Sequence, residues 1–244
     1  FGPLKVGVFS TGNELVQGGQ PLAAGQIHDS NRPTLLALAR SRGFEAIDLG
    51  WLPDDPAILT KALASGIDQV DVLLTTGGAA GGDADLLWHV LSQPMHHQGM
   101  ALPTEAHAWK LKLRPGRPLV IGRIGQTPVF GLPGNPVAAL LSFLFVIDAA
   151  LQKMAGIIDP RPLPRIRARA GTAIRKRPGR QELLRVTLCY HESDDLPVAL
   201  PAGSQSSAQL RSVTEADGIA VLPEDRGPVA EGDRLDVVPL RGLL

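Results

Sequence analysis

Glycines, hydroxyl groups and carboxylates follow four apolar runs of the sequence, and these groups are suited to binding phosphate or another anion. The segments are 10–14 (STGNE), 54–55 (DD), 75–85 (TTGGAAGGDAD) and 131–136 (GLPGNP). The glycines of segment 75–85 let the backbone approach a ligand and turn N–H groups toward it, just before a predicted helix. A permissive loop without a ligand is the alternative, and the pattern is neither a P-loop nor a dinucleotide fingerprint.

Two acidic positions extend this chemistry to a metal ion. Asp55 precedes a proline, which favours a helix N-cap and leaves Asp54 free to face the ligand. Asp85 either faces the ligand as well or is a first-turn acid that interacts with a helix dipole. Carboxylates repel a phosphate unless Mg²⁺ bridges them, because this ion binds a few carboxylates together with phosphate and water. Asp54 and Asp85 are therefore the predicted Mg²⁺ ligands.

A basic run at 109–118 (WKLKLRPGRP) precedes another apolar run. Such a run is commonly a solvated strand entry. Its predicted place beside the same sheet also makes Lys110, Arg114 and Arg117 candidate anion ligands. The histidines match no zinc-binding spacing.

Alternating strands and helices over residues 4–156 must position these groups. Strands are predicted in the apolar runs 5–10, 45–50, 70–78, 118–122 and 128–134. Helices are predicted from Ser30 to Gly43, from Asp54 through Leu63, around 85–91, and from Asn135 to near Gly156. This order predicts an α/β fold with a parallel sheet and helices on both faces. Ligands of such sheets bind outside the carboxyl ends of the strands, where the polar segments lie.

The pattern changes at the proline-rich segment 159–164, after which only short strands separated by turns are predicted. We therefore predict an α/β domain at 1–157, a linker at 158–165 and a small all-β domain, a barrel or sandwich, at 166–244. A formal net charge of zero gives no support for nucleic-acid binding. The single Cys189 fits a reducing cytoplasm, and the apolar run 137–151 is short for a membrane span.

Motifs along the whole chain, in order, resemble those of MoeA/gephyrin-type molybdopterin molybdenumtransferases. In the α/β part they are STGNEL (10–15), GQIHDSNRP (25–33), TTGGAAGGDAD (75–85), LRPGRP (113–118) and GLPGNPVAAL (131–140). In the β part they are RPGRQELLRV (177–186), SQSSAQLRSVTEADGIAVLPED (204–225) and EGDRLDVVPL (231–240). One such motif is weak evidence, whereas the ordered set is specific. The resemblance implies a MogA-like α/β domain followed by a β-barrel.

The resemblance also implies an activity: insertion of molybdate into adenylylated molybdopterin (molybdopterin-AMP), with Mg²⁺ and with release of AMP. The family's acidic active-site positions correspond to Glu14, Asp54 and Asp85, and its anion-guiding positions to Lys110, Arg114 and Arg117. Its substrate-binding positions correspond to Thr76, Gly77, Gly78, Gly82, Pro133, Gly134, Asn135 and Ser207.

The sequence departs from the family pattern in several places. Asn13 replaces an aspartate, Ala79–Ala80 lacks the usual serine hydroxyl, and Arg114 and Arg117 replace lysines. Full-length members carry two further domains before the first strand, and their cleft includes the N-terminal region of a homodimer partner. We therefore expect this chain to fold alone but to be a poor catalyst.

Two alternative functions stay open from the sequence. A molybdopterin adenylyltransferase is built on the same α/β domain but lacks the β extension. A non-catalytic pterin-binding scaffold, as in the gephyrin relatives, would bind a receptor peptide, although no segment marks a peptide groove.

Overall fold

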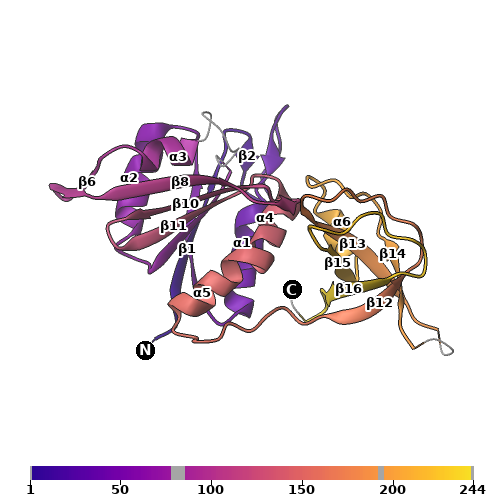
Figure 1. Cartoon of the computed structure of the whole chain (residues 1–244). Helices are drawn as coiled ribbons and strands as arrows, with labels where there is room; N and C mark the ends of the chain where they lie inside the picture. Colours follow the sequence, from indigo (N-terminus) through magenta and orange to yellow (C-terminus); the bar gives the residue numbers. More distant parts are fainter. Residues whose placement is uncertain (1, 78–85, 192–194, 243–244) are drawn as a thin grey trace.

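The computed structural model describes residues 2–77, 86–191 and 195–242, whose strands form two large sheets and two short ribbons. The first sheet has the order β4-β1-β5-β11-β10-β8 (Figure 1). Its strands are β4 (Glu45–Leu52), β1 (Lys5–Thr11), β5 (Val72–Thr76), β11 (Thr127–Leu132), β10 (Pro118–Ile124) and β8 (Thr104–Lys110). Neighbouring strands from β4 to β11 run parallel, which confirms the predicted α/β sheet for this part.

The sheet is mixed rather than wholly parallel at its other edge. β10 pairs antiparallel with β11, and β8 pairs antiparallel with β10. Only Gly125 and Gln126 separate β10 from β11, which is too short for the crossover that parallel strands need. Gly125 has a φ of 59°, as a tight hairpin turn requires. The two adjacent apolar runs at 118–134 therefore form a hairpin.

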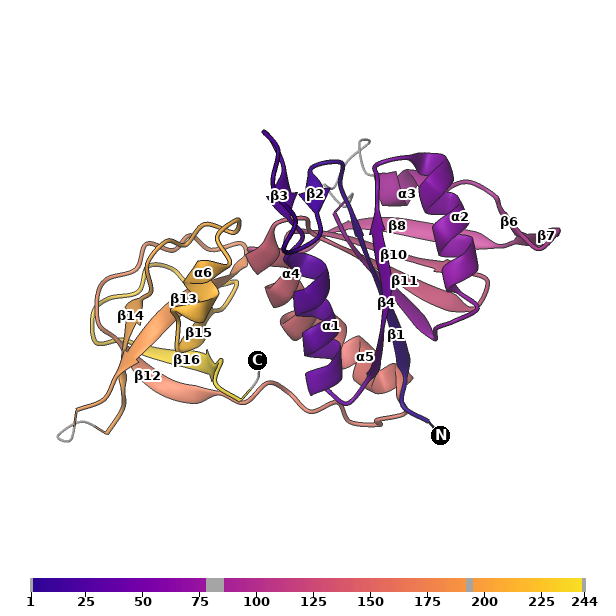
Figure 2. The same ribbon diagram turned by 180° about the vertical axis from the view of Figure 1, so that it is seen from behind.

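Helices cover both faces of this sheet, as predicted (Figures 1 and 2). One face carries α1 (Asn31–Ser41), α4 (Pro136–Ser142), the π-helical turn η1 (Phe143–Ile147) and α5 (Asp148–Met154). The other face carries α2 (Pro56–Gly66) and α3 (Leu86–Leu91). Alternate β5 residues serve the two cores, because Val72 and Leu74 pack with the first group and Leu73 packs with the second. Asp55 caps α2 by accepting a hydrogen bond from the Ile58 N–H at 2.9 Å, which confirms the predicted N-cap.

The helix Pro136–Met154 is long and apolar enough to cross a membrane by length and composition, and 67% of its most apolar window is buried inside the structure. A core helix passes the same test, and this helix packs into the α1 side of the core. Burial raises the pKa of Asp148 within it, although Arg42 at 3.2 Å opposes the shift.

The second sheet closes on itself as a barrel. Its order is β14-β12-β16-β15-β13-β9, and β14 also pairs with β13. The strands are β12 (Ile166–Ala170), β13 (Gln181–Cys189), β14 (Val198–Pro201), β15 (Gly218–Leu222), β16 (Arg234–Pro239) and the short β9 (Leu113–Arg114). A single turn of helix, α6 (Arg211–Thr214), precedes β15. The predicted small β domain is therefore present.

Two features join the barrel to the α/β part. β9 comes from the predicted α/β segment but pairs in parallel with the start of β13, with Arg114 opposite Glu182. Barrel residues such as Val221 and Leu240 share one buried cluster with Leu35 of α1 and Leu140 of α4. The basic segment before β10 is thereby fixed between the two parts.

The remaining strands form two small ribbons, β2 (Leu15–Val16) with β3 (Ile27–His28), and β6 (Met95–His97) with β7 (Met100–Leu102). The β2–β3 ribbon stands beside the carboxyl ends of the parallel strands (Figure 2).

Candidate functional site

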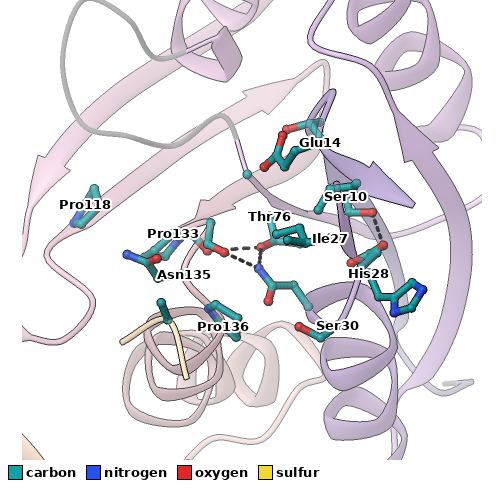
Figure 3. A pocket seen from close by; sticks show the side chains of 17 residues that line it. Ser10, Glu14, Ile27, His28, Ser30, Thr76, Pro118, Pro133, Asn135 and Pro136 are labelled. Carbon is teal, nitrogen blue, oxygen red and sulfur yellow. Dashed lines mark hydrogen bonds between the residues drawn. The ribbon is translucent and has the colours of Figure 1, made fainter. Parts of the chain in front are cut away.

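A recess of about 540 Å³ lies at the carboxyl ends of β1, β5 and β11 (Figure 3). We call it the strand-end recess. Of the predicted site residues, it is lined by Glu14, Thr76, Gly77, Pro133, Gly134 and Asn135. The structure thus brings these six residues together at the carboxyl ends of the parallel strands, the place where ligands of open α/β sheets bind.

Asn31, which the sequence did not single out, connects two segments of the strand-end recess by hydrogen bonds. Its Nδ2 donates to Thr76 Oγ1 at 2.8 Å and to the Gly134 carbonyl at 2.7 Å. Thr76 Oγ1 in turn donates to the Pro133 carbonyl at 3.2 Å. These bonds fix the amide orientation and leave Asn31 Oδ1 without a partner among the described residues. The only sequence signal was the place of Asn31 in the motif DSNRP.

A charged network forms part of the wall of the recess. Asp29 is 6% exposed and accepts hydrogen bonds from the Ser10 hydroxyl and from Nε of Arg32. Arg32 also reaches Asp48 with NH1. Burial acts to lower the pKa of Arg32, but hydrogen bonds with Asp48 and Asp29 outweigh it, and the net shift is upward. Asp29 is thus already neutralised by Arg32.

Of the three predicted acidic positions, two, Glu14 and Asp54, lie in the described part of the chain. Glu14 lines the strand-end recess, whereas Asp54 does not. The Asn13 N–H donates to Asp54 Oδ2 at 3.3 Å, and the Asp54 N–H donates to Asn13 Oδ1 at 3.1 Å. Asp85, Gly78 and Gly82 lie outside the described residues. Within residues 2–77, 86–191 and 195–242, no group of three His, Cys, Asp or Glu side chains could hold a metal ion. The described carboxylates therefore do not by themselves form the predicted Mg²⁺ site.

A second recess of about 620 Å³ lies between the α/β part and the barrel, and we call it the arginine recess. It shares Pro118, Pro133 and Asn135 with the strand-end recess, so the two recesses are neighbours. Arg114, Arg117 and Ser207 of the predicted set line it. Lys110, at the end of β8, lines neither recess.

Arg185 is the feature of the arginine recess that the sequence did not predict. It is 1% exposed, and its NH2 donates to the Ser204 and Ser206 carbonyls, both at 3.1 Å. Its Nε has no hydrogen-bond partner among the described residues, and no described carboxylate lies within salt-bridge distance. Burial lowers the pKa of Arg185. A buried cation without a counter-ion is costly, so an anion in the recess would offset that cost.

Gln205 holds the loop that faces Arg185. Its Oε1 accepts from the Arg185 N–H at 3.0 Å, and its Nε2 donates to the carbonyls of Arg185 and Ala202 at 3.0 and 2.9 Å. The Ser207 carbonyl accepts from the Val137 N–H of α4 at 3.0 Å. The segment SQSS thus joins the barrel to the start of α4 at the edge of the arginine recess.

Gly77, in the strand-end recess, has a backbone conformation and a close neighbour that leave no room for a side chain. Its φ is 88°, and an added Cβ would lie 2.1 Å from the Thr11 carbonyl oxygen. We expect Gly77→Ala to cost on the order of 3 kcal/mol of unfolding free energy, from the left-handed backbone and the overlap together. At Gly134, an added Cβ would meet only the Gly77 Cα, at 3.6 Å, so Gly134→Ala is the matched control. Urea unfolding compares the two, and equal midpoints would contradict this explanation.

The structure combines an α/β sheet with an appended barrel, with one recess at the strand ends and another between the two parts. Residues 7–153 match the family described as "Probable molybdopterin binding domain", and residues 167–240 match "MoeA C-terminal region (domain IV)". The chain therefore belongs to the molybdopterin-binding domain family, in the two-part arrangement of MoeA, which confirms the resemblance read from the motifs.

Individual relatives agree with this assignment. The chain is 34% identical to a molybdopterin molybdenumtransferase of Haemophilus influenzae, over 99% of this chain and 57% of that protein. It is 27% identical to gephyrin of Dictyostelium discoideum, over 96% of this chain and 36% of that protein. The MoeA structure from Pyrococcus horikoshii aligns with a TM-score of 0.77 at 30% identity, covering 97% of this chain and 54% of that one. The chain thus spans about half the length of the first of these relatives and of the MoeA structure.

Proposed function

We propose that the chain takes part in molybdenum cofactor biosynthesis by binding a phosphorylated pterin in the strand-end recess and molybdate in the arginine recess. The observation that carries the proposal is Arg185, a buried guanidinium without a carboxylate partner among the described residues, in a recess that adjoins the one at the strand ends. Arg114 and Arg117 line the same recess, and forked guanidinium donors suit tetrahedral oxyanions.

The strand-end recess suits the phosphorylated pterin on different grounds. Gly77 and Gly134 line it without side chains, and the start of α4 at Pro136 lies in the same wall, where the helix dipole favours negative charge. The buried oxygens of Asn31 and Thr11 that lack partners among the described residues offer hydrogen-bond acceptors close to this wall. A pterin ring carries N–H donors as well as acceptors, so these oxygens match its chemistry.

In this proposal the reaction joins adenylylated molybdopterin with molybdate and releases AMP. The chain holds the two reactants in adjoining recesses, which replaces a bimolecular encounter with a positioned one. Mg²⁺ would neutralise charge on the phosphates, with Glu14 and Asp54 as the nearest described carboxylates that the resemblance assigns to the active site.

Two other functions are disfavoured by particular observations. An adenylyltransferase needs only the α/β part, whereas here the barrel contributes Arg185 and Ser207 to the arginine recess. ATP-dependent adenylylation of molybdopterin by this chain would favour that alternative. A pure scaffold gives no reason for a buried guanidinium beside a recess, and peptide binding that is independent of pterin would favour it.

We also propose that 1–157 and 166–244 are the domain units, that the protein is cytoplasmic, and that activity needs a homodimer and the length that the relatives have in addition. Both recesses are open to solvent at one side, and closure strengthens electrostatic interactions in a site.

We expect cofactor formation by this chain alone to be at least about tenfold slower than by a chimaera carrying the N-terminal part of the Haemophilus relative. Equal rates would mean that the site is complete within these residues.

Arg114 and Arg117 supply a prediction on the arginine recess. Arg114 and Arg117 are exposed, so each contributes up to about 1 kcal/mol to an ionic interaction, and Arg114→Gln with Arg117→Gln should weaken molybdate binding roughly tenfold at low salt. The loss should shrink at high salt, because the long-range part of the attraction is screened. Calorimetric titration measures this, with Arg40→Gln plus Arg161→Gln as a control of equal charge. No loss at low salt would make the two arginines solvated surface charges.

A further inference from the structure

A third recess, of about 460 Å³, adjoins the arginine recess on the barrel side and shares Arg114, Arg175 and Glu182 with it. We call it the barrel recess. Its lining includes five cationic side chains and one carboxylate: Arg114, Arg175, Lys176, Arg177, Arg180 and Glu182. The whole chain has a formal net charge of zero. The positive charge at this recess is therefore local, because the fold brings these cationic side chains together.

The backbone beneath this charge is held in place from inside. Lys176 is 3% exposed, and its Nζ donates to the carbonyls of Arg177 and Arg180 at 3.0 and 2.7 Å. The Gly179 N–H donates to the Glu224 carbonyl at 2.8 Å. The turn 177–180 is thus fixed at both its ends and its middle, and its arginine side chains are presented from a rigid backbone.

The opposite wall of the barrel recess is fixed to the same segment. Ile174, which precedes Arg175, exchanges two backbone hydrogen bonds with Val229, at 2.9 and 3.0 Å. Pro228, next to Val229, lines the recess. The recess therefore keeps its shape without a ligand, which lowers the entropy cost of binding.

The guanidinium groups lack sufficient counter-ions. Glu182 is 6% exposed and lies 3.5 Å from Arg114 and 3.7 Å from Arg180. In the described part of the chain, no carboxylate forms an ion pair with Arg175, Lys176 or Arg177. Like charges gathered without partners destabilise a fold through repulsion. Arg175 and Arg177 are exposed and form no ion pair within the described residues, and Arg180 shares its one carboxylate partner there, Glu182, with Arg114.

We propose that the barrel recess is a separate binding site for a phosphate group, with Arg177 and Arg180 as its principal ligands and Arg175 between it and the arginine recess. Arginine suits this ligand, because the planar fork of N–H donors matches phosphate oxygens. Lys176 holds the turn and supplies fixed positive charge behind the ligand. The site goes beyond the molybdate and pterin positions proposed above and does not require either of them.

The experiment is calorimetric titration of the whole chain with inorganic phosphate at low salt. The site variant is Arg177→Gln with Arg180→Gln, and the control of equal charge is Arg40→Gln with Arg161→Gln, both exposed and remote from the recess lining. Arg185→Met is titrated as well, because it alters only the arginine recess. We expect the site variant to lose one phosphate site or at least tenfold in affinity, with the control unchanged and Arg185→Met retaining that site.

Unchanged binding in the site variant would overturn the proposal, and so would an equal loss in the control, which would indicate a diffuse field only. Parallel titrations with AMP and pyrophosphate separate the sources of the phosphate group. Loss of AMP binding in the same site variant would assign the site to a nucleotide phosphate, and binding of orthophosphate alone would assign it to the free ion. Failure of Arg185→Met to affect molybdate would count against the proposed function and leave the barrel recess untouched.

Discussion

Replacing Arg185 with methionine should strongly weaken molybdate binding in the arginine recess while changing stability little. Truncating a buried charged partner costs about 2–5 kcal/mol of binding, so a loss on the order of 100-fold is expected. The stability terms oppose one another. Two hydrogen bonds to the Ser204 and Ser206 carbonyls are lost, at about 1 kcal/mol each, but an uncompensated buried charge is removed as well.

This prediction separates two roles of Arg185. Molybdate titration and thermal unfolding are measured on the same samples, with Arg167→Gln as a control on an exposed barrel strand residue. A large fall in the melting temperature, with molybdate affinity intact in the protein that remains folded, would show that Arg185 serves to stabilise the loop 204–207. In that case the argument from its missing counter-ion would be wrong.

Gly134→Val should remove pterin binding without disturbing the fold. An added Cβ at Gly134 meets nothing closer than the Gly77 Cα at 3.6 Å, and Gly134 does not have a left-handed backbone. The branched side chain would therefore extend into the strand-end recess that Gly134 lines. We expect molybdopterin affinity to fall roughly 100-fold, which corresponds to about 3 kcal/mol.

A matched control for this change is Gly18→Val, since a Cβ at Gly18 has open space around it. Fluorescence titration of molybdopterin compares both variants with the wild type. Equal affinity in Gly134→Val and the wild type would mean that the pterin binds elsewhere. Molybdate affinity of Gly134→Val should remain, because Gly134 does not line the arginine recess.

The sequence predicted those features that depend on local chemistry. The cap at Asp55 and the parallel strands from β4 to β11 follow from residue types and spacing. The hairpin at 118–132 could also have been predicted, since the five residues between the predicted strands 118–122 and 128–134 are too few for a crossover. Treating every apolar run as a parallel strand overlooked that spacing.

Other features depend on contacts between distant segments. Asn31 matters because Thr76 and Gly134 meet its amide, and these residues lie 45 and 103 positions away. Arg185 occupies an ordinary place in a strand pattern, and its importance arises from burial against the loop 204–206. Sequence spacing carries no information on such burial, so neither residue could be assigned a role beforehand.

The most direct test of the account is a crystal structure of the chain grown with molybdopterin and tungstate, which replaces molybdate as a strong anomalous scatterer. The account predicts pterin-phosphate density in the strand-end recess between Gly77 and Gly134. It also predicts an anomalous peak within hydrogen-bonding distance of Arg117 or Arg185 in the arginine recess. Well-ordered pterin and tungstate bound outside these two recesses would contradict it.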